Sequence, residues 1–317
     1  MKTVTLIVPC FNEADVLPML YKEVSRVISS LSFRYSFELL FVDDGSNDET
    51  LNIIKAIAER NTQVKYISFS RNFGKEAAML AGMKNANSDF VGIIDADLQH
   101  SPDLIPEMLV AVDDEGYDVA AAKRSDRAGE AKIKSALSAQ FYKVINKISE
   151  TKIDDNAQDF RIMKKAVVDA IVSLEEKNRF SKGIFSWVGF NVKWFPHENR
   201  ERAAGETKWS IRKLMRYALD GIMSFTVSPL RLSFIVAVVL GILSVILAFL
   251  GLVIPFNLPD YRIYMLLLGA IFFVTAIVCV LTGIVGEYLG RAYIEIKSRP
   301  VYIISETNIG KTIFDEI

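Results

Sequence analysis

Residues 90–100 read Phe90-Val91-Gly92-Ile93-Ile94-Asp95-Ala96-Asp97-Leu98-Gln99-His100, an apolar run that ends abruptly in two acidic residues. A short apolar run of this kind is typical of a strand that is buried on both faces of a parallel sheet. In open sheets of this type, the ligand site lies at the carboxyl ends of the strands. The stretch therefore predicts a buried strand over 90–94, with Asp95 and Asp97 at its functional end.

The same pattern recurs along residues 1–113, where apolar runs alternate with segments of helical spacing. Expected strands lie at 4–8, 37–42, 64–69 and 90–94, and expected helices at 14–31, 48–60, 75–85 and 104–113. This alternation indicates an α/β fold with a mostly parallel sheet and helices on both faces. Polar side chains follow three of the strands: Asn12 and Glu13, Asp43 and Asp44, and Asp95 and Asp97.

The Asp95 and Asp97 pair suits a divalent cation. If the chain stays extended, the period of two points both carboxylates in the same direction. Mg²⁺ or Mn²⁺ takes such hard oxygen ligands and completes its shell with substrate phosphates and water. An Asp-x-Asp pair alone is commonly a surface turn, but its position after a buried strand favours a metal site for a nucleotide diphosphate.

The other acidic positions have two interpretations each. Asp43-Asp44-Gly45-Ser46 can form an Asx turn into a helix capped by Ser46 or Asn47, or one aspartate can accept a hydrogen bond from a base or a ribose. Glu13 can be a first-turn carboxylate favoured by the helix dipole, or it can line the same crevice. Because all these residues are expected at one sheet edge, the functional interpretation is favoured.

Composition separates a mixed N-terminal part from an apolar C-terminal part. The 317-residue chain has a net charge of −1 and a sequence pI near 6.2, which gives no support for a nucleic-acid partner. Residues 232–256 and 264–286 contain no charged side chain. Each stretch is long enough to cross a hydrocarbon core of roughly 30 Å as a helix. We therefore expect two transmembrane helices, joined by a short loop that contains Pro255 and Pro259.

Basic residues flank this hairpin: Arg212, Lys213, Arg216 and Arg231 before it, and Arg291, Lys297 and Arg299 after it. Their positions predict an integral inner (plasma) membrane protein with the catalytic domain and both termini in the cytoplasm. We expect a catalytic domain over 1–208, an amphipathic juxtamembrane region over 209–229, the hairpin over 230–290 and a cytoplasmic tail over 291–317. The juxtamembrane helix can lie in the headgroup layer or pack on the catalytic domain. Glu287 and Arg291 are expected to form an i,i+4 contact.

Six motifs occur in a specific order: V-P-C-F-N-E (8–13), V-D-D-G-S (42–46), S-R-N-F-G-K-E (70–76), D-A-D-L-Q-H (95–100), Q-D-F-R (158–161) and R-A-A-G-E-T-K-W (202–209). Together they resemble the motifs of family 2 glycosyltransferases, which have the Rossmann-like GT-A fold. With the two spans and G-E-Y-L-G-R (286–291), nearly the whole chain resembles bacterial polyprenyl-phosphate glycosyltransferases of the bactoprenol glucosyltransferase type. These enzymes are relatives of dolichol-phosphate mannose synthase.

The resemblance implies roles for the matched positions. Donor-binding residues would be Pro9, Phe11, Glu13, Val42, Asp44, Lys75, Asp95, Ala96, Asp97 and Arg124. Metal ligands would be Asp95, Asp97 and Gln99, acceptor-phosphate ligands Arg127, Arg202 and Lys208, and catalytic residues Asp97, Asp159, Arg202 and Lys208. For Lys75 an exposed charge is the alternative. Because Phe11 stands where some relatives have Tyr, a hydrogen bond from that position is not expected.

The reaction implied by the resemblance is an inverting transfer of one sugar to a polyprenyl phosphate such as undecaprenyl phosphate. UDP-glucose is the preferred donor, ahead of UDP-N-acetylglucosamine, UDP-galactose and GDP-mannose. Asp159 is the matched candidate base, but beside Arg161 it can instead orient the substrate or form an ion pair. Two spans are few to shelter a prenyl chain, so we expect a homo-oligomer. Rival interpretations are another lipid or glycan acceptor, or a non-catalytic scaffold. His100 and His197 are too isolated in the sequence to suggest a zinc site.

Overall fold

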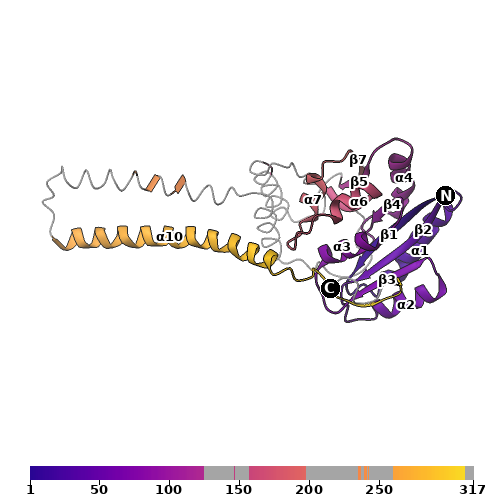
Figure 1. Ribbon diagram of the computed structural model, residues 1–317, viewed down its shortest axis with the longest axis horizontal. Helices are drawn as coiled ribbons and strands as arrows, with labels where there is room; N and C mark the ends of the chain where they lie inside the picture. The colour runs from indigo at the N-terminus through magenta and orange to yellow at the C-terminus, as the bar shows by residue number, and fades with distance from the viewer. Residues whose placement is uncertain are drawn as a thin grey trace. The chain divides into compact units, whose positions relative to one another are not determined.

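The computed structural model describes residues 1–124, 157–197 and 260–310, together with six single positions between these ranges. The chain divides into two units, Met1–Gly221 with Pro300–Ile317, and Ile222–Arg299. In its described part, the first unit contains an eight-stranded sheet with the order β7-β5-β6-β4-β1-β2-β3-β8 (Figure 1).

The strands are β1 (Lys2–Cys10), β2 (Tyr35–Asp43), β3 (Val64–Phe69), β4 (Phe90–Ile93), β5 (Val119–Arg124), β6 (Ala157–Lys164), β7 (Val192–His197) and β8 (Ile304–Thr307). The helices of this unit are α1 (Leu17–Ser30), α2 (Thr50–Arg60), α3 (Lys75–Asn85), α4 (Ile105–Asp113), α6 (Lys165–Val172) and α7 (Ser181–Trp187), and the 3₁₀ helix η1 (Pro102–Leu104) precedes α4. Every strand and helix expected up to residue 113 is present.

Strand direction agrees with the predicted mostly parallel sheet. β1 pairs in parallel with β2 and β4, β2 with β3, and β5 with β7. Of the eight strands, β6 and β8 run antiparallel to their neighbours. The carboxyl ends of β1, β2 and β4 therefore meet at one edge of the sheet, as expected from the sequence.

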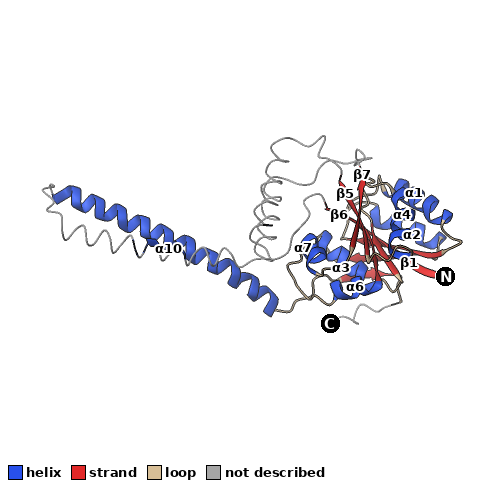
Figure 2. Cartoon of the chain, turned by 90° about the horizontal axis from the view of Figure 1, so that it is seen from above, coloured by secondary structure: helices blue, strands red, loops and turns tan. Residues whose placement is uncertain are grey.

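Helices cover both faces of the sheet, with α1, α2 and α4 on one face and α3, α6 and α7 on the other (Figure 2). Alternate residues of β1, including Val4, Leu6 and Val8, pack with the buried stripe of α1 in one core cluster. On the opposite face α3 lies very close to β1. A Cβ atom at Gly82 would meet a methyl carbon of Ile7 at 2.3 Å, so this position requires glycine.

Two helix starts differ from the expectation. α1 begins at Leu17 because the main-chain oxygen of Glu13 first accepts bonds in a turn from the amides of Val16 and Leu17. α2 begins at Thr50, whose amide donates to the Asp48 carboxylate at 3.0 Å. The alternative in which Ser46 or Asn47 caps this helix is therefore wrong, since these residues lie before the turn that leads into α2.

The segment expected as a C-terminal tail contributes to the sheet. Residues Ile304–Thr307 form β8, which pairs antiparallel with β3 and is the last strand at this edge of the sheet. Ser305, Glu306 and Thr307 are three consecutive polar residues, so the segment lacks the apolar pattern that would predict a strand.

In the second unit, α10 (Asp260–Ile296) contains the expected span 264–286. Within the described residues it is the single helix long and apolar enough to cross a membrane, over Phe273–Ile296. The expected contact between Glu287 and Arg291 is confirmed, at 2.9 Å. The first expected span, 232–256, lies outside the described residues except for a few single positions, and the juxtamembrane region 209–229 lies entirely outside them.

Candidate active site

Strand register brings Asp159 to the carboxyl end of β4. β6 is antiparallel to β4, and Ile93 lies opposite Arg161. Asp159 precedes Arg161 by two residues, so it lies just beyond the last residue of β4, beside Asp95. Two carboxylates that are 64 positions apart in the sequence thus belong to one sheet edge.

The Lys75 side chain joins these two carboxylates. Its ammonium nitrogen lies 2.6 Å from an oxygen of Asp95 and 2.5 Å from an oxygen of Asp159. Lys75 is the first residue of α3, so β3, β4 and β6 all direct chain segments to this point. Of the two alternatives for Lys75, the unpaired exposed charge does not describe this structure.

The carboxylate of Asp159 pairs with Lys75 and not with its sequence neighbour Arg161. The Arg161 guanidinium donates instead to the main-chain oxygens of Gln158 at 2.7 Å and of Asp159 at 3.3 Å. It is buried and lies over the ring of Phe185, 3.5 Å from the centroid. Burial lowers the pKa of Arg161 to about 10, against the opposing effects of Asp159 and Glu76. Arg161 therefore supports the main chain around Asp159.

Charge pairing keeps all three groups of this cluster ionised. Burial raises the pKa of Asp95, but Lys75 and His100 outweigh it, so this pKa lies well below its usual range. Burial and the charge of Asp95 also raise the pKa of Asp159, yet Lys75 lowers it overall. Burial lowers the pKa of Lys75, and the two carboxylates more than reverse the effect. The cluster thus carries one positive and two negative charges at neutral pH.

The turn after β4 separates polar from apolar side chains. The chain leaves strand geometry after Ile93 and bends at residues 96–97, and Leu98 has a positive φ of 56°. The extended chain assumed for Asp95 and Asp97 is therefore not present. Burial nevertheless alternates, with Ala96, Leu98 and His100 buried and Asp95, Asp97 and Gln99 partly exposed. The Gln99 amide donates to an Asp97 oxygen at 3.2 Å, which closes this turn.

Asp43 and Asp44, at the end of β2, are both buried and hold the loop after β3. Asp44 accepts from the amides of Phe73 at 2.6 Å and Gly74 at 2.9 Å. Asp43 accepts from the Ser68 hydroxyl at 2.8 Å. Burial raises the pKa of Asp44 to about 6, although the two amides act in the opposite direction. Part of the hydrogen-bonding capacity of Asp44 is therefore used within the protein.

Gly45 allows the loop after β2 to approach the loop after β3. Its φ is +66°, and a Cβ atom there would lie 2.4 Å from the Arg71 carbonyl carbon. Neither the conformation nor the space is available to another residue. The next residues fix the loop after β1: the Ser46 hydroxyl accepts from the Asn12 amide at 2.9 Å, and the Asn47 amide donates to the Asn12 side chain at 2.8 Å.

The remaining predicted donor residues occupy neighbouring strand ends. Pro9 and Val42 are buried and lie opposite each other in β1 and β2, and Phe11 follows β1. Glu13 lies before α1, so it is not a first-turn helix residue, and its amide donates to the Thr50 hydroxyl at 2.8 Å. Arg124 ends β5. Arg127, Arg202 and Lys208 lie outside the described residues.

Two features of the site had no local signal in the sequence. The rings of His100 and His197, 97 positions apart, are joined by a 2.9 Å nitrogen–nitrogen contact, and His100 lies 3.6 Å from an Asp95 oxygen. The two histidines are far apart in the sequence but meet in the structure, because β7 lies beyond β6 and β5 on the same side of β4. Glu76 is the other feature. Its carboxylate accepts from the amide of Ser181 at 3.1 Å and from the Ser181 hydroxyl, which joins α3 to α7.

The fold and the site together define the GT-A class of glycosyltransferases: a mostly parallel sheet with carboxylates at the carboxyl ends of its strands. Glucosyl-3-phosphoglycerate synthase from Mycobacterium tuberculosis, solved with Mn²⁺, UDP-glucose and phosphoglyceric acid, shares this fold. The match has a TM-score of 0.50 and 16% sequence identity, and it covers 70% of this chain and 79% of that chain.

The sequence pattern of Glycosyl transferase family 2 matches residues 5–172. The chain is 40% identical over 307 residues to the putative glycosyltransferase CsbB of Bacillus subtilis, covering 96% of this chain and 92% of that protein. It is also 40% identical over 309 residues to the SfII prophage-derived bactoprenol glucosyl transferase of Shigella flexneri, covering 97% and 99%. The chain therefore belongs to glycosyl transferase family 2 and is a glycosyltransferase.

Proposed function

We propose that the protein transfers one sugar from a nucleotide-sugar, UDP-glucose by preference, to polyprenyl phosphate such as undecaprenyl phosphate. The transfer inverts the anomeric configuration and makes a lipid-linked sugar donor for modification of cell-surface glycans. One observation carries this proposal: the similarity to relatives named bactoprenol glucosyl transferase spans 97% of the chain. It therefore extends over both the candidate active site and the apolar helix α10.

The residues at the end of β4 fit a divalent cation. Asp95, Asp97 and Gln99 offer two carboxylates and an amide oxygen, which are the hard ligands that Mg²⁺ and Mn²⁺ prefer. In the described parts of the chain, no group of three or more His, Cys, Asp or Glu side chains is placed to hold a metal ion. A cation held by Asp95, Asp97 and Gln99 would take the rest of its shell from a diphosphate and water. When bound, such a cation would neutralise charge on the leaving diphosphate.

The chain's own residues would align the substrates and balance their charge. A lipid monophosphate is largely dianionic at neutral pH, because the second pKa of a phosphate monoester is about 6. Its oxygen needs little deprotonation before it attacks the anomeric carbon. The lowered pKa of Asp159 makes this carboxylate a weak base. We therefore assign Asp159 to orientation of the substrate, together with Lys75. Arg127, Arg202 and Lys208 remain proposed ligands of the acceptor and leaving phosphates.

The proposed arrangement in the membrane follows the sequence. We propose a hairpin of two transmembrane helices over residues 230–290, and the stretch 264–286 expected as its second span is contained in α10. The catalytic domain (1–208), the juxtamembrane region (209–229) and the segment 291–317 lie in the cytoplasm. A homo-oligomer would provide enough helices to shelter the prenyl chain. Cross-linking in native membranes tests this state, and a protein that yields only monomer contradicts it.

Transfer to lipid can be measured directly. The full-length protein, purified in detergent, is incubated with Mg²⁺ or Mn²⁺, undecaprenyl phosphate and a panel of labelled nucleotide-sugars. We expect label to enter the organic phase with one donor, and to be released from the lipid by mild acid. Label that enters only water-soluble glycan would contradict the lipid-phosphate acceptor. Equal transfer from every donor would contradict the preference for UDP-glucose.

A further inference from the structure

The segment 302–308, which follows α10, is bound to the edge of the sheet by specific polar contacts. The Glu306 carboxylate pairs with the Lys55 ammonium at 2.6 Å and accepts from the Tyr66 hydroxyl at 3.0 Å. The Asn308 side chain accepts from the Tyr66 amide at 2.8 Å, and the Thr307 hydroxyl donates to the main-chain oxygen of Tyr66 at 2.7 Å. These contacts fix the register of β8 on β3.

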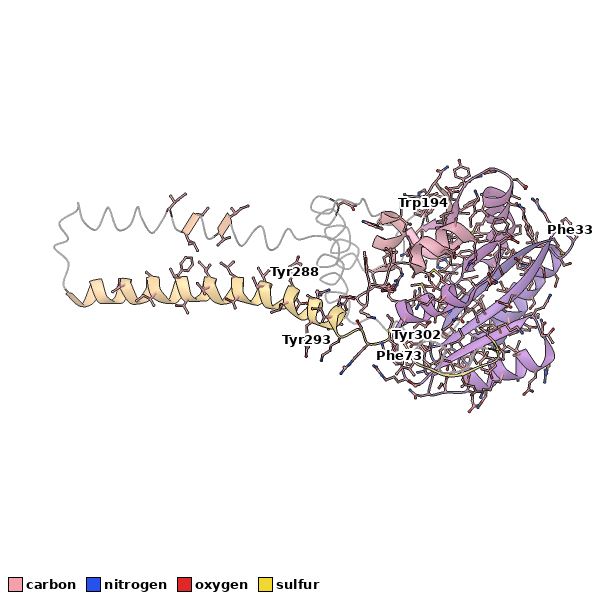
Figure 3. All side chains as sticks on the ribbon, viewed as in Figure 1. Phe33, Phe73, Trp194, Tyr288, Tyr293 and Tyr302 are labelled. Atoms are coloured by element: carbon pink, nitrogen blue, oxygen red, sulfur yellow. The ribbon has the colours of Figure 1, made fainter. Side chains whose placement is uncertain are left out.

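The start of the segment packs on the end of β3. Tyr302 is buried, and its ring stacks on Phe69 with a centroid distance of 5.0 Å and an interplanar angle of 13°. Phe69 in turn meets the ring of Phe73 edge-on at 5.8 Å. Tyr302 and Phe73 lie at the same end of the catalytic unit (Figure 3). The Ile303 main-chain oxygen also accepts from the Ser70 amide at 3.0 Å.

The loop 70–74 that these contacts hold is also part of the candidate donor site. Phe73 and Gly74 donate their amides to Asp44, and the following residue is Lys75, which pairs with Asp95 and Asp159. The loop has no regular secondary structure, and Gly74 has a φ of +103°. Its conformation depends on side-chain contacts at both ends, with Asp44 on one side and the aromatic rings on the other.

A second connection leads from the segment to the other aspartate of β2. The Ser305 hydroxyl donates to the main-chain oxygen of Ser68 at 3.1 Å. The Ser68 hydroxyl donates to Asp43 at 2.8 Å, and both Ser68 and Asp43 are buried. The segment thus contacts the residues that hold Asp43 as well as the loop that holds Asp44.

We propose that the segment 302–308 is a positioning element of the donor site, in which Tyr302 acts through Phe69 and Phe73 on the loop that orients Asp44 and Lys75. Residues 297–301 alone separate Tyr302 from the end of α10. The chain that leaves the apolar helix therefore continues directly into the support of the donor site. This proposal rests on the proposed nucleotide donor, but it does not depend on the identity of the acceptor.

The test compares Tyr302→Ala with Tyr302→Phe in the full-length protein. Phe33→Ala is the matched control, because Phe33 is an aromatic residue that is 82% exposed at another part of the unit (Figure 3). Loss of one stacked aromatic pair corresponds to a change of up to about tenfold. We expect Tyr302→Ala to weaken UDP binding by calorimetry about tenfold and to raise the KM for the nucleotide-sugar similarly, with the KM for the lipid acceptor unchanged. Tyr302→Phe and Phe33→Ala should match the wild type.

Several results would overturn the proposal. One is a folded Tyr302→Ala protein whose UDP affinity is within twofold of the wild type, and another is a KM that changes equally for donor and acceptor. If Tyr302→Ala does not fold, Ser305→Ala provides the test, since it removes only the hydroxyl that donates to the main-chain oxygen of Ser68. Unchanged UDP affinity of Ser305→Ala counts against the proposal.

Wild-type protein that binds UDP but transfers no sugar to lipid refutes the proposed acceptor alone. Failure of the wild type to bind any nucleotide refutes the donor class on which this inference rests.

Discussion

The Lys75 ammonium lies 2.5 Å from a carboxylate oxygen of Asp159, although the two residues are 84 positions apart in the sequence. The same ammonium also contacts Asp95, so the charge of Lys75 lies between the candidate metal ligand Asp95 and the candidate catalytic carboxylate of Asp159. Without this ammonium, the two carboxylates would repel each other in a partly buried site. Lys75 therefore stabilises an arrangement that the reaction is proposed to use.

Replacement of Lys75 by methionine keeps an unbranched, flexible side chain that is one atom shorter and removes its charge. The Asp95 and Asp159 carboxylates then lose their shared partner, so the acceptor and donor phosphates meet an excess of negative charge. We expect turnover to fall by about 10²-fold or more, as on loss of one preorganised charge contact. The measurement is steady-state transfer of labelled sugar to lipid. Lys22→Met, at an exposed position of α1, is the control, and equal activities of the two variants would contradict this role.

Asp159→Asn distinguishes a general base from an orienting carboxylate. The lowered pKa of Asp159 predicts that the protein does not depend on proton transfer to this group. We expect a fall of about tenfold to 10²-fold in kcat with unchanged donor affinity, less than the range of up to 10⁴ typical of a lost general base. A loss of several orders of magnitude at unchanged donor affinity would establish Asp159 as the base and refute the orienting role.

Gly45→Ala tests the close approach of the loops after β2 and β3. Gly45 and Gly116 both have a positive φ, but only at Gly45 would a new Cβ atom meet another main chain. We expect backbone strain to lower the free energy of unfolding of Gly45→Ala and of Gly116→Ala by about 1–3 kcal/mol. Only Gly45→Ala should lose UDP affinity as well. Melting curves and calorimetry separate the two effects. Normal UDP affinity in Gly45→Ala would show that the loop contact is not needed for the donor.

The buried Glu76 carboxylate should make stability depend on pH. Burial and the nearby Asp159 raise its pKa to about 7, against the opposing hydrogen bonds from Ser181. Between the unfolded value of 4.5 and this folded value, the folded protein binds more protons than the unfolded protein, so the contribution of Glu76 to stability falls as pH rises. Glu76→Gln removes that contribution. We expect its melting temperature, relative to wild type, to increase from pH 4.5 to 7 and then to level off.

The contrary outcome for Glu76 is a difference in melting temperature that stays constant over this range, which would mean that the carboxylate remains ionised in the folded protein. Lys165→Met, which removes a surface i,i+4 pair with Asp169 at 2.9 Å, provides a control without a buried carboxylate.

Local sequence patterns were sufficient for the first half of the fold. β3 and α3 have the bounds expected from their apolar runs and from Gly74, which ends the loop before α3. β5 was not predicted because Val-Ala-Ala-Ala has little β propensity, and this strand is stabilised by its neighbours β6 and β7. β8 is polar and depends on contacts with residues about 240 positions earlier, such as Tyr66.

The candidate site shows the same division. The positions of Asp44, Asp95 and Asp97 at strand ends follow from the alternation of strands and helices, because parallel strands end at one edge. The contacts that these residues make do not follow from that alternation. Lys75 reaches Asp159 only because β6 reverses direction beside β4, and His100 meets His197 only because β7 lies on the same side of β4 as β6 and β5, three strands away. No local pattern encodes such contacts.

Binding of Mn²⁺ in the presence of UDP, followed by electron paramagnetic resonance, tests the central claim most directly. The full-length protein is titrated with Mn²⁺ with and without UDP, and Asp97→Asn is compared with the wild type. We expect UDP to convert free Mn²⁺ into a bound form with the wild type, and this conversion to be lost with Asp97→Asn. A free Mn²⁺ signal that the wild type and UDP leave unaltered, or equal binding by the two proteins, would contradict a metal-bridged diphosphate site at the end of β4.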